Sequence, residues 1–194
     1  MSDAPVNLTP LLPSLSALQR LSDRVGGRGV IIGGVAASLL GQSRLTADLD
    51  ATFLLSLADL PGLVDAAKAE GLLPRIADFE SFARQHRILL LYHPESGIDI
   101  DISLGILPFE EEMVARSRLH SIGSLAIRLP TPEDLIILKA VAHRPKDMLD
   151  IQAIIQRHPD LDKQRIEFWL RQFVDALGMP ELWDDVTKWL DPEE

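Results

Sequence analysis

The stretch IIGGVAASLLGQSRLTADLDATF, residues 31–53, decides the fold of this chain. Residues 30–32 are apolar and predict a short buried strand, which ends at Gly33 and Gly34. The segment VAASLL that follows is helical in composition, so we expect a helix from about Val35. The unpaired N–H groups and the positive dipole end of that helix would face the glycine turn. Such an arrangement binds anions, phosphate in particular.

A second strand is expected at residues 47–55, where Asp48 and Asp50 alternate with other residues. Alternation places both carboxylates on one face, roughly 6 to 7 Å apart along the strand. Their repulsion costs free energy unless cations lie between them, and hard divalent ions prefer such oxygen ligands. The pair therefore predicts a metal site beside the anion-binding turn, the arrangement that two-metal phosphoryl or nucleotidyl transfer requires.

The glycine pair, the thirteen-residue gap and Asp48-x-Asp50 together resemble the signature of the DNA polymerase β-like nucleotidyltransferase superfamily. The resemblance implies an α/β (α+β) fold, with a mixed β-sheet flanked by helices as a palm and a C-terminal helical region. It also implies transfer of a nucleoside monophosphate from a nucleoside triphosphate (NTP) to an acceptor hydroxyl. Asp48, Asp50 and a third carboxylate would hold two Mg²⁺ (or Mn²⁺) ions with the NTP, whose phosphates Gly33 and Gly34 would cradle.

Two residues are candidates for the third carboxylate. Residues 87–92 and 98–103 are β-rich runs joined by HPESG, a predicted hairpin turn. In the second run Asp99 and Asp101 share the face opposite three isoleucines, so alternation cannot choose between them. One of the two is expected to be an ordinary solvated residue. The resemblance favours Asp101, because the acidic residue of related sequences precedes an apolar stretch and a Leu-Pro-Phe-Glu turn, here ISLGILPFE.

The second half of the chain narrows the resemblance to the AbiEii-like nucleotidyltransferases of the type IV toxin group. In these proteins a helix that carries a lysine is followed by an Arg-x-Lys-Asp-x-x-Asp stretch. The resemblance covers roughly residues 25–158. The matching positions in this sequence are Lys139, Arg144, Lys146, Asp147 and Asp150.

Residue chemistry predicts two helices around these positions, one over residues 132–143 and one that begins at Pro145. Lys139 interrupts an apolar run: either its stem covers the edge of the core, or its charge neutralises the nucleotide's phosphates, as the resemblance implies. Asp147 stabilises the helix dipole or has a functional role. Asp150 has a functional role or pairs with a basic neighbour.

Arg44 lies in the loop before the Asp-x-Asp strand and is a second candidate for triphosphate contact, with an ordinary surface arginine as the alternative. The organisation of the chain predicts two parts. Residues 1–130 would form the palm with an N-terminal helix, and residues 131–194 a helical region packed on it.

Composition limits the partners. The chain has 194 residues, a net charge of −10 and no cysteine, which excludes disulfides and thiolate catalysis. It shows neither an apolar run of eighteen residues nor a charged leader, so we expect a cytoplasmic protein that does not enter the membrane. The negative charge weighs against a broad nucleic-acid surface. An RNA acceptor stays compatible with it, because a local patch could form from basic residues in the middle of the chain: Arg116, Arg118, Arg128, Lys139, Arg144 and Lys146.

Three functions are open at this stage. The first is a toxin-like nucleotidyltransferase that acts on an RNA 3′ end or another macromolecule and is neutralised by a cognate antitoxin protein. The second is an enzyme that modifies a small hydroxylated compound such as an antibiotic, for which an acidic surface would suit a cationic acceptor. The third is a catalytically silent module that keeps the fold for binding. Because all three carboxylate positions are filled, the sequence argues against the third.

Overall fold

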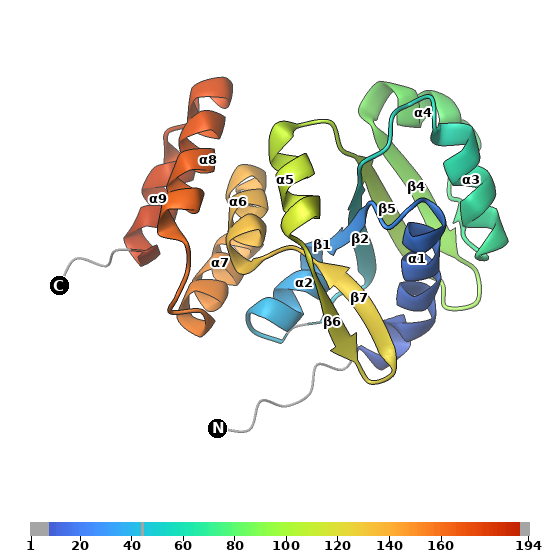
Figure 1. The fold of residues 1–194 in the computed structure, drawn as a ribbon, viewed down its shortest axis with the longest axis horizontal. Coiled ribbons are helices and arrows are strands. Elements are labelled where there is room, and N and C mark those ends of the chain that lie inside the picture. Colours follow the sequence, from blue (N-terminus) through green and yellow to red (C-terminus); the bar gives the residue numbers. More distant parts are fainter. Residues whose placement is uncertain (1–7, 44, 191–194) are drawn as a thin grey trace.

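The computed structural model describes residues 8–43 and 45–190, which form a five-stranded sheet, a two-stranded hairpin and flanking helices (Figure 1). No helix in these ranges is both long and apolar enough to span a bilayer. In chain order the elements are the 3-10 helix η1 Thr9–Leu11, α1 Leu12–Arg24, β1 Gly29–Ile32, α2 Gly33–Leu40, β2 Asp48–Phe53, α3 Leu60–Ala69, β3 Leu73–Pro74, α4 Phe79–His86, β4 Ile88–His93, β5 Ile98–Leu104, α5 Pro108–Arg116, β6 Arg118–Ile122, β7 Leu125–Leu129, α6 Pro132–Ala142, α7 Pro145–Arg157, α8 Lys163–Leu177 and α9 Glu181–Leu190.

The five-stranded sheet has the order β1-β2-β5-β4-β3. Strands β2 and β5 run parallel, whereas the other neighbours are antiparallel, so the predicted mixed sheet flanked by helices is confirmed. The parallel pair brings together two segments that α3, β3, α4 and β4 separate in the sequence. In its register Asp48 lies opposite Asp99, and Asp50 lies opposite Asp101. The two aspartate pairs of the sequence are therefore direct neighbours in space.

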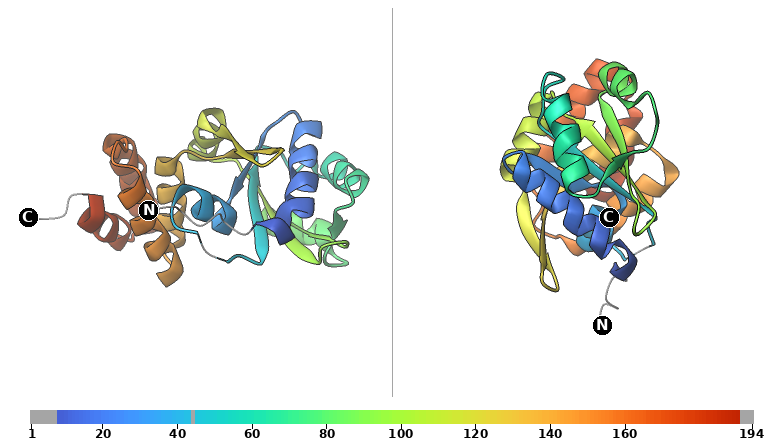
Figure 2. Two further views of the ribbon diagram at one scale, coloured as in Figure 1. Left: turned by 90° about the horizontal axis from the view of Figure 1, so that it is seen from below. Right: turned by 90° about the vertical axis from the view of Figure 1, so that its right-hand side faces the viewer.

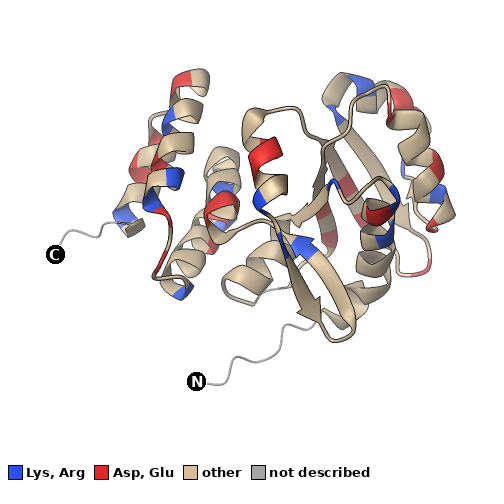
Figure 3. Ribbon diagram, viewed as in Figure 1, with Lys and Arg blue, Asp and Glu red and all other residues tan. Residues whose placement is uncertain are grey.

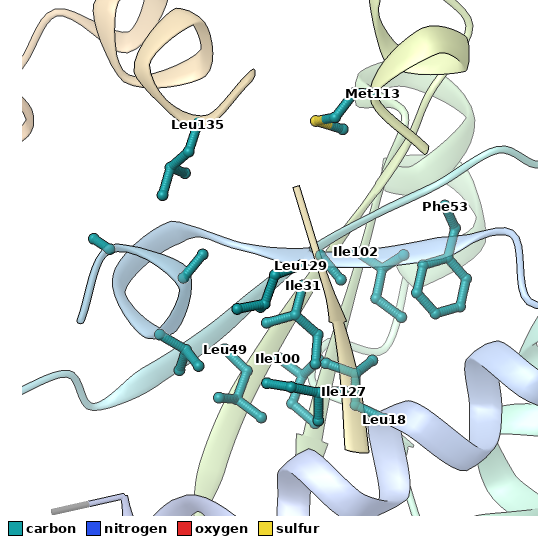
Figure 4. Close-up of a cluster of buried hydrophobic side chains, with 14 of the residues drawn as sticks. Leu18, Ile31, Leu49, Phe53, Ile100, Ile102, Met113, Ile127, Leu129 and Leu135 are labelled. Carbon is teal, nitrogen blue, oxygen red and sulfur yellow. The ribbon is translucent and has the colours of Figure 1, made fainter. Parts of the chain in front are cut away.

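The sheet places its aspartates on one face because the other face is buried. Ile100 and Ile102 of β5 have no exposed surface, and neither have Leu89 and Leu91 of β4. Each such side chain stabilises the fold by about 1.5–3 kcal/mol relative to exposure. A shift by one residue would exchange the apolar and acidic faces, so the core fixes the register of the carboxylates. Figure 4 shows that this cluster continues into the hairpin and the helices, with labelled side chains at Leu18, Ile31, Leu49, Met113, Ile127, Leu129 and Leu135.

The two predicted helices around the Arg-x-Lys-Asp stretch are confirmed. Thr131 caps α6, accepting a hydrogen bond at its side-chain oxygen from the backbone N–H of Asp134 at 3.3 Å. The helix ends before His143, which is left-handed with φ of 49°, and α7 begins at Pro145. Helices α8 and α9 pack beyond them at one end of the molecule (Figure 2). The division of the chain into a palm and a helical region at residue 130 stays a prediction.

One local prediction needs correction, because helix α2 begins at Gly33 instead of Val35, so both glycines belong to its first turn. Two further segments have a structure that local sequence patterns do not show. The stretch after α3 contains strand β3 as well as helix α4. Helix α5 ends at Arg116, and Arg118 begins β6, which pairs with β7. Strands of two to five residues carry little periodicity of their own, and tertiary pairing decides their state.

Candidate active site

A cleft of about 410 Å³ lies where the first turn of α2 and the strands β2 and β5 meet the turn between α6 and α7. Asp99 and Asp150 are not part of its wall, and Arg44 lies outside the described residues. The structure thus brings most of the predicted site residues together. Those that line the cleft are Gly33, Gly34, Asp48, Asp50, Asp101, Lys139, Arg144, Lys146 and Asp147.

The carboxylates of β2 and β5 form the acidic side of the cleft. Burial raises the pKa of Asp50, and the negative charges of Asp48 and Asp101 raise it further. Arg144 and Lys146, on the opposite side, lower the pKa of Asp50 and offset only part of this rise. The carboxylates therefore repel one another, and a bound cation would relieve that repulsion.

Gly33 allows the close contact between α2 and β2. Its φ of +64° lies in the left-handed region, which glycine adopts without strain. A Cβ atom at this position would lie only 1.9 Å from Oδ2 of Asp50, so no side chain fits there. Ile32, at the N-cap of α2, makes no side-chain hydrogen bond to the helix. The side chain of Ile32 thus leaves the first N–H groups of α2 uncapped, and these groups lie at the end of the helix that is close to Asp50.

Lys139 is buried in a network of ion pairs between α6 and α7. Its Nζ lies 3.1 Å from Oδ1 of Asp147 and 2.7 Å from Oδ2 of Asp150. Arg144 donates from Nε to Oδ2 of Asp147 at 2.6 Å. Burial alone would raise the pKa of Asp147, but the hydrogen bonds from Arg144 and Lys139 hold it below its ordinary value. The Lys139 side chain is only 5% exposed, so its ammonium group is buried along with its stem and is held by two carboxylates. The pairing of Asp150 with a basic neighbour is confirmed.

Two side chains beside the carboxylates escaped the sequence analysis. Thr46 donates from Oγ1 to Oδ1 of Asp48 at 2.8 Å, and its place two residues before Asp48 is a local signal that could have shown this. Arg75, directly after β3, pairs with both Asp99 and Asp101. Burial raises the pKa of Asp101, and Arg75 acts in the opposite direction. No local pattern indicates this contact, because it forms only when β3 joins the edge of the sheet.

The basic residues in the middle of the chain do not form one patch. Lys139, Arg144 and Lys146 line the cleft, whereas Arg116 and Arg118 line a separate cavity of about 300 Å³ formed by the N-terminal end of α6 and the C-terminal end of α7. Acidic and basic residues are interspersed along the visible helices (Figure 3). The charge pattern therefore favours local contacts with phosphate over one broad basic face.

Comparison with known proteins identifies the family. The model of a family described as nucleotidyl transferase AbiEii toxin, type IV toxin–antitoxin system, matches residues 17–182. The chain belongs to this family. The match extends from α1 into α9, further at both ends than the resemblance seen in the sequence motifs. AbiEii membership and the mixed sheet agree with a nucleotidyltransferase palm. No protein with a curated function matches the chain.

Two solved structures share the fold of this AbiEii-family chain. One is an antigenic nucleotidyltransferase-like protein from Paracoccidioides brasiliensis, with 18% identity, a TM-score of 0.56 and 95% of each chain covered. The other is the antibiotic-resistance factor ANT(2'')-Ia, with 16% identity, a TM-score of 0.55, and coverage of 91% of this chain and 96% of the other. At these identities the likeness establishes the fold alone.

The donor set of the AbiEii-family cleft fits magnesium. In the described ranges no three His, Cys, Asp or Glu side chains form a ready-made metal site. Mg²⁺ seldom needs one, because it binds through one or two carboxylates, water and substrate phosphates. Asp48, Asp50 and Asp101 offer only oxygen atoms and line one cleft beside a helix N-terminus. These residues could hold Mg²⁺ or Mn²⁺ together with a triphosphate.

Proposed function

We propose that this protein is a metal-dependent nucleotidyltransferase that moves a nucleoside monophosphate from an NTP to an acceptor hydroxyl. The observation that carries the proposal is the position of Asp48, Asp50 and Asp101 in one cleft with the first turn of α2. A hydroxyl oxygen of the acceptor would attack the α-phosphorus, and pyrophosphate would leave. When bound, two Mg²⁺ or Mn²⁺ ions would supply positive charge to the reacting phosphate.

The residues of the chain divide the remaining work. Backbone N–H groups of Gly33 and Gly34 would bind the β and γ phosphates. Asp101 would accept the proton of the acceptor hydroxyl, for which its raised pKa makes it a better base. Arg144, whose side chain is 59% exposed, faces the carboxylates and would bind the triphosphate together with Lys146.

Two further residues stay candidates for triphosphate contact. Lys139 lines the cleft, but two carboxylates already hold its ammonium group, so a phosphate would have to share it with them. Arg44 adjoins Leu45 and Thr46, which line the cleft, although the position of Arg44 itself is not described. We therefore rank Arg144 and Lys146 before these two.

For the acceptor we propose RNA or another macromolecule, with a cognate antitoxin protein as partner. The type IV toxin–antitoxin description of the family supports both. The cations that face the carboxylates offer local phosphate contacts, which an RNA end needs more than a broad basic surface.

A small cationic acceptor is the second candidate, because the acidic side of the cleft would attract it. The fold that the chain shares with ANT(2'')-Ia is compatible with this alternative but does not favour it at 16% identity. Transfer of labelled nucleotide to total RNA and to aminoglycosides, measured in parallel, separates the two acceptors. Label in RNA alone supports the first candidate, and label in aminoglycosides alone supports the second.

Nucleotide binding tests the proposal directly. An NTP with Mg²⁺ should raise the melting temperature more than either alone, because a ligand at 100 times its Kd stabilises the folded state by about 2.7 kcal/mol. Each of the four NTPs is tested at millimolar concentration with Mg²⁺ or Mn²⁺, and the Asp50→Asn variant serves as the control that lacks a metal ligand. If no combination shifts the transition of the wild-type protein, the catalytically silent module replaces the enzyme as the better account.

A further inference from the structure

From the edge of the sheet, Arg75 reaches Asp101, which lines the cleft. Its backbone N–H donates to the carbonyl of Leu90 at 3.0 Å, which extends the pairing of β3 with β4 by one residue. Leu90 is in turn opposite Asp101 on β5. Residues that face each other across antiparallel strands share a face of the sheet, so the Arg75 side chain crosses β4 on the same face as the carboxylates.

The guanidinium of Arg75 bridges the two carboxylates of β5. Nη1 lies 2.7 Å from Oδ2 of Asp99, and Nη2 lies 2.8 Å from Oδ1 of Asp101. The two nitrogens belong to one rigid planar group, so the bond to Asp99 fixes the place of the bond to Asp101. Asp99 does not line the cleft, but it holds the guanidinium of Arg75 in the position from which this group pairs with one oxygen of Asp101.

The bridge is open to exchange. The side chains of Arg75, Asp99 and Asp101 are 28%, 51% and 43% exposed. Ion pairs with this much solvent contact are weak and can be replaced at low cost. A divalent ion at Asp101 would repel the guanidinium and compete with it for the same negative charge.

We propose that Arg75 is an internal counter-ion that competes with the divalent ion for Asp101 and so sets the metal affinity of the cleft. The inference rests on the metal-dependent activity proposed above. Arg75 acts through Asp101 and is a positioning residue. A site weakened in this way fills efficiently only when a triphosphate supplies further oxygen ligands, so metal and nucleotide bind together.

Binding of Mn²⁺ to the full chain, followed by electron paramagnetic resonance of the free ion, tests the competition. Arg75→Gln should bind Mn²⁺ alone about tenfold more tightly than the wild type. The reason is that the variant lacks the positive charge on the far side of the Asp101 carboxylate, and the repulsion between that charge and a divalent ion in water corresponds to about this factor in Kd. Arg84→Gln is the matched control, because Arg84 is an exposed arginine of neighbouring helix α4. It should leave the Mn²⁺ affinity within about twofold of the wild type, because Arg84 does not line the cleft and solvent and salt screen exposed charges.

Equal Mn²⁺ affinities of the wild type and Arg75→Gln would overturn the inference, and so would an equal gain in Arg84→Gln. If the wild type binds Mn²⁺ neither alone nor with ATP, the proposed metal-dependent function fails as well. A second measurement needs no variant. The side-chain nitrogen resonance of Arg75 in the wild type should move as Mg²⁺ saturates the protein, and a constant resonance through saturation would contradict the competition.

Discussion

Two clusters of ion pairs lie beside the same cleft, and they differ in burial and in charge balance. Around Lys139, the carboxylates of Asp147 and Asp150 are almost fully buried and face cations at 2.7 and 3.1 Å. On the sheet, Asp48, Asp50 and Asp101 form an acidic group in which Arg75 pairs with Asp101, while Arg144 and Lys146 offset only part of the repulsion at Asp50. The first cluster is balanced in charge and joins two helices, whereas the carboxylates of the second repel one another. Unbalanced charge, more than the mere presence of acidic residues, is therefore the feature on which the proposed ligand site rests.

The largest effect is expected when the unbalanced cluster loses a carboxylate. Asp48→Asn and Asp50→Asn should each abolish nucleotide transfer, because each removes a predicted metal ligand. The fold should stay intact or become slightly more stable, since one of several repelling charges is gone. Pyrophosphate release and a urea unfolding curve measure the two effects. Activity within tenfold of the wild type in either variant would contradict the metal site.

The balanced cluster should respond in the opposite way, through stability. Lys139→Met leaves Asp147 and Asp150 buried without their shared cation, which costs about 3–5 kcal/mol of unfolding free energy. Arg144→Gln, which removes an exposed partner of the same Asp147, is the control and should cost about 1 kcal/mol or less. Urea unfolding of both variants measures the difference. Equal losses of unfolding free energy in the two variants would mean that the burial of Lys139 does not make its ion pairs more important for stability than those of the exposed Arg144.

The next effect decides between the carboxylates of β5. Asp101→Asn should lower turnover at least about a hundredfold, in the range for loss of an acid–base group, and Asp99→Asn should be much milder. The reason is that Asp101 lines the cleft, whereas Asp99 is not part of its wall. Pyrophosphate release at saturating NTP ranks the two variants. The reverse ranking would place the reacting acceptor nearer the start of β5.

The smallest effect is a difference in the sign of pH dependence. The pKa of Asp50 is raised in the folded state. Between the ordinary and the raised pKa, the folded protein therefore holds more protons at this residue than the unfolded chain does. Stability falls as the pH rises through that window. The pKa of Asp147 is lowered in the folded state. The ionised Asp147 therefore stabilises the fold at any pH above the ordinary pKa of aspartate. This stabilisation is lost as the pH falls through the lowered pKa of the folded state. Asp50→Asn should therefore raise the urea midpoint at pH 7 and lose this advantage below about pH 4. Asp147→Asn should lower the midpoint at pH 7, and an equal response of both variants would contradict the contrast.

The sequence predicted those parts of the site that depend on local order. The turn at Gly33 and the alternation of Asp48 and Asp50 can be recognised within one strand–helix–strand unit, because strand and helix periodicity follow from neighbouring residues. The break between α6 and α7 was likewise visible at Pro145.

The contacts of the cations could not be predicted in this way. Arg75 reaches Asp101 across 26 positions of sequence, through a strand too short to show a pattern. Lys139 meets its carboxylates only because the turn after α6 folds α7 back against it. Lys139 could be singled out in the sequence but its partners could not, and Arg75 gave no signal at all, since both sets of contacts depend on how whole elements pack. The catalytic assignments themselves stay predictions until the variants are measured.

The contact between Gly33 and Asp50 also constrains how the protein can change over generations. As long as an aspartate stands at position 50, a mutation that adds a side chain at position 33 places it 1.9 Å from the carboxylate. We therefore expect substitutions at the two positions to depend on each other, although the residues lie in different elements. A lineage that loses the proposed activity is expected to replace the aspartate first, because that step removes the steric clash, whereas the left-handed φ of +64° continues to favour glycine afterwards. The order of substitutions in such a lineage would record when the activity was lost.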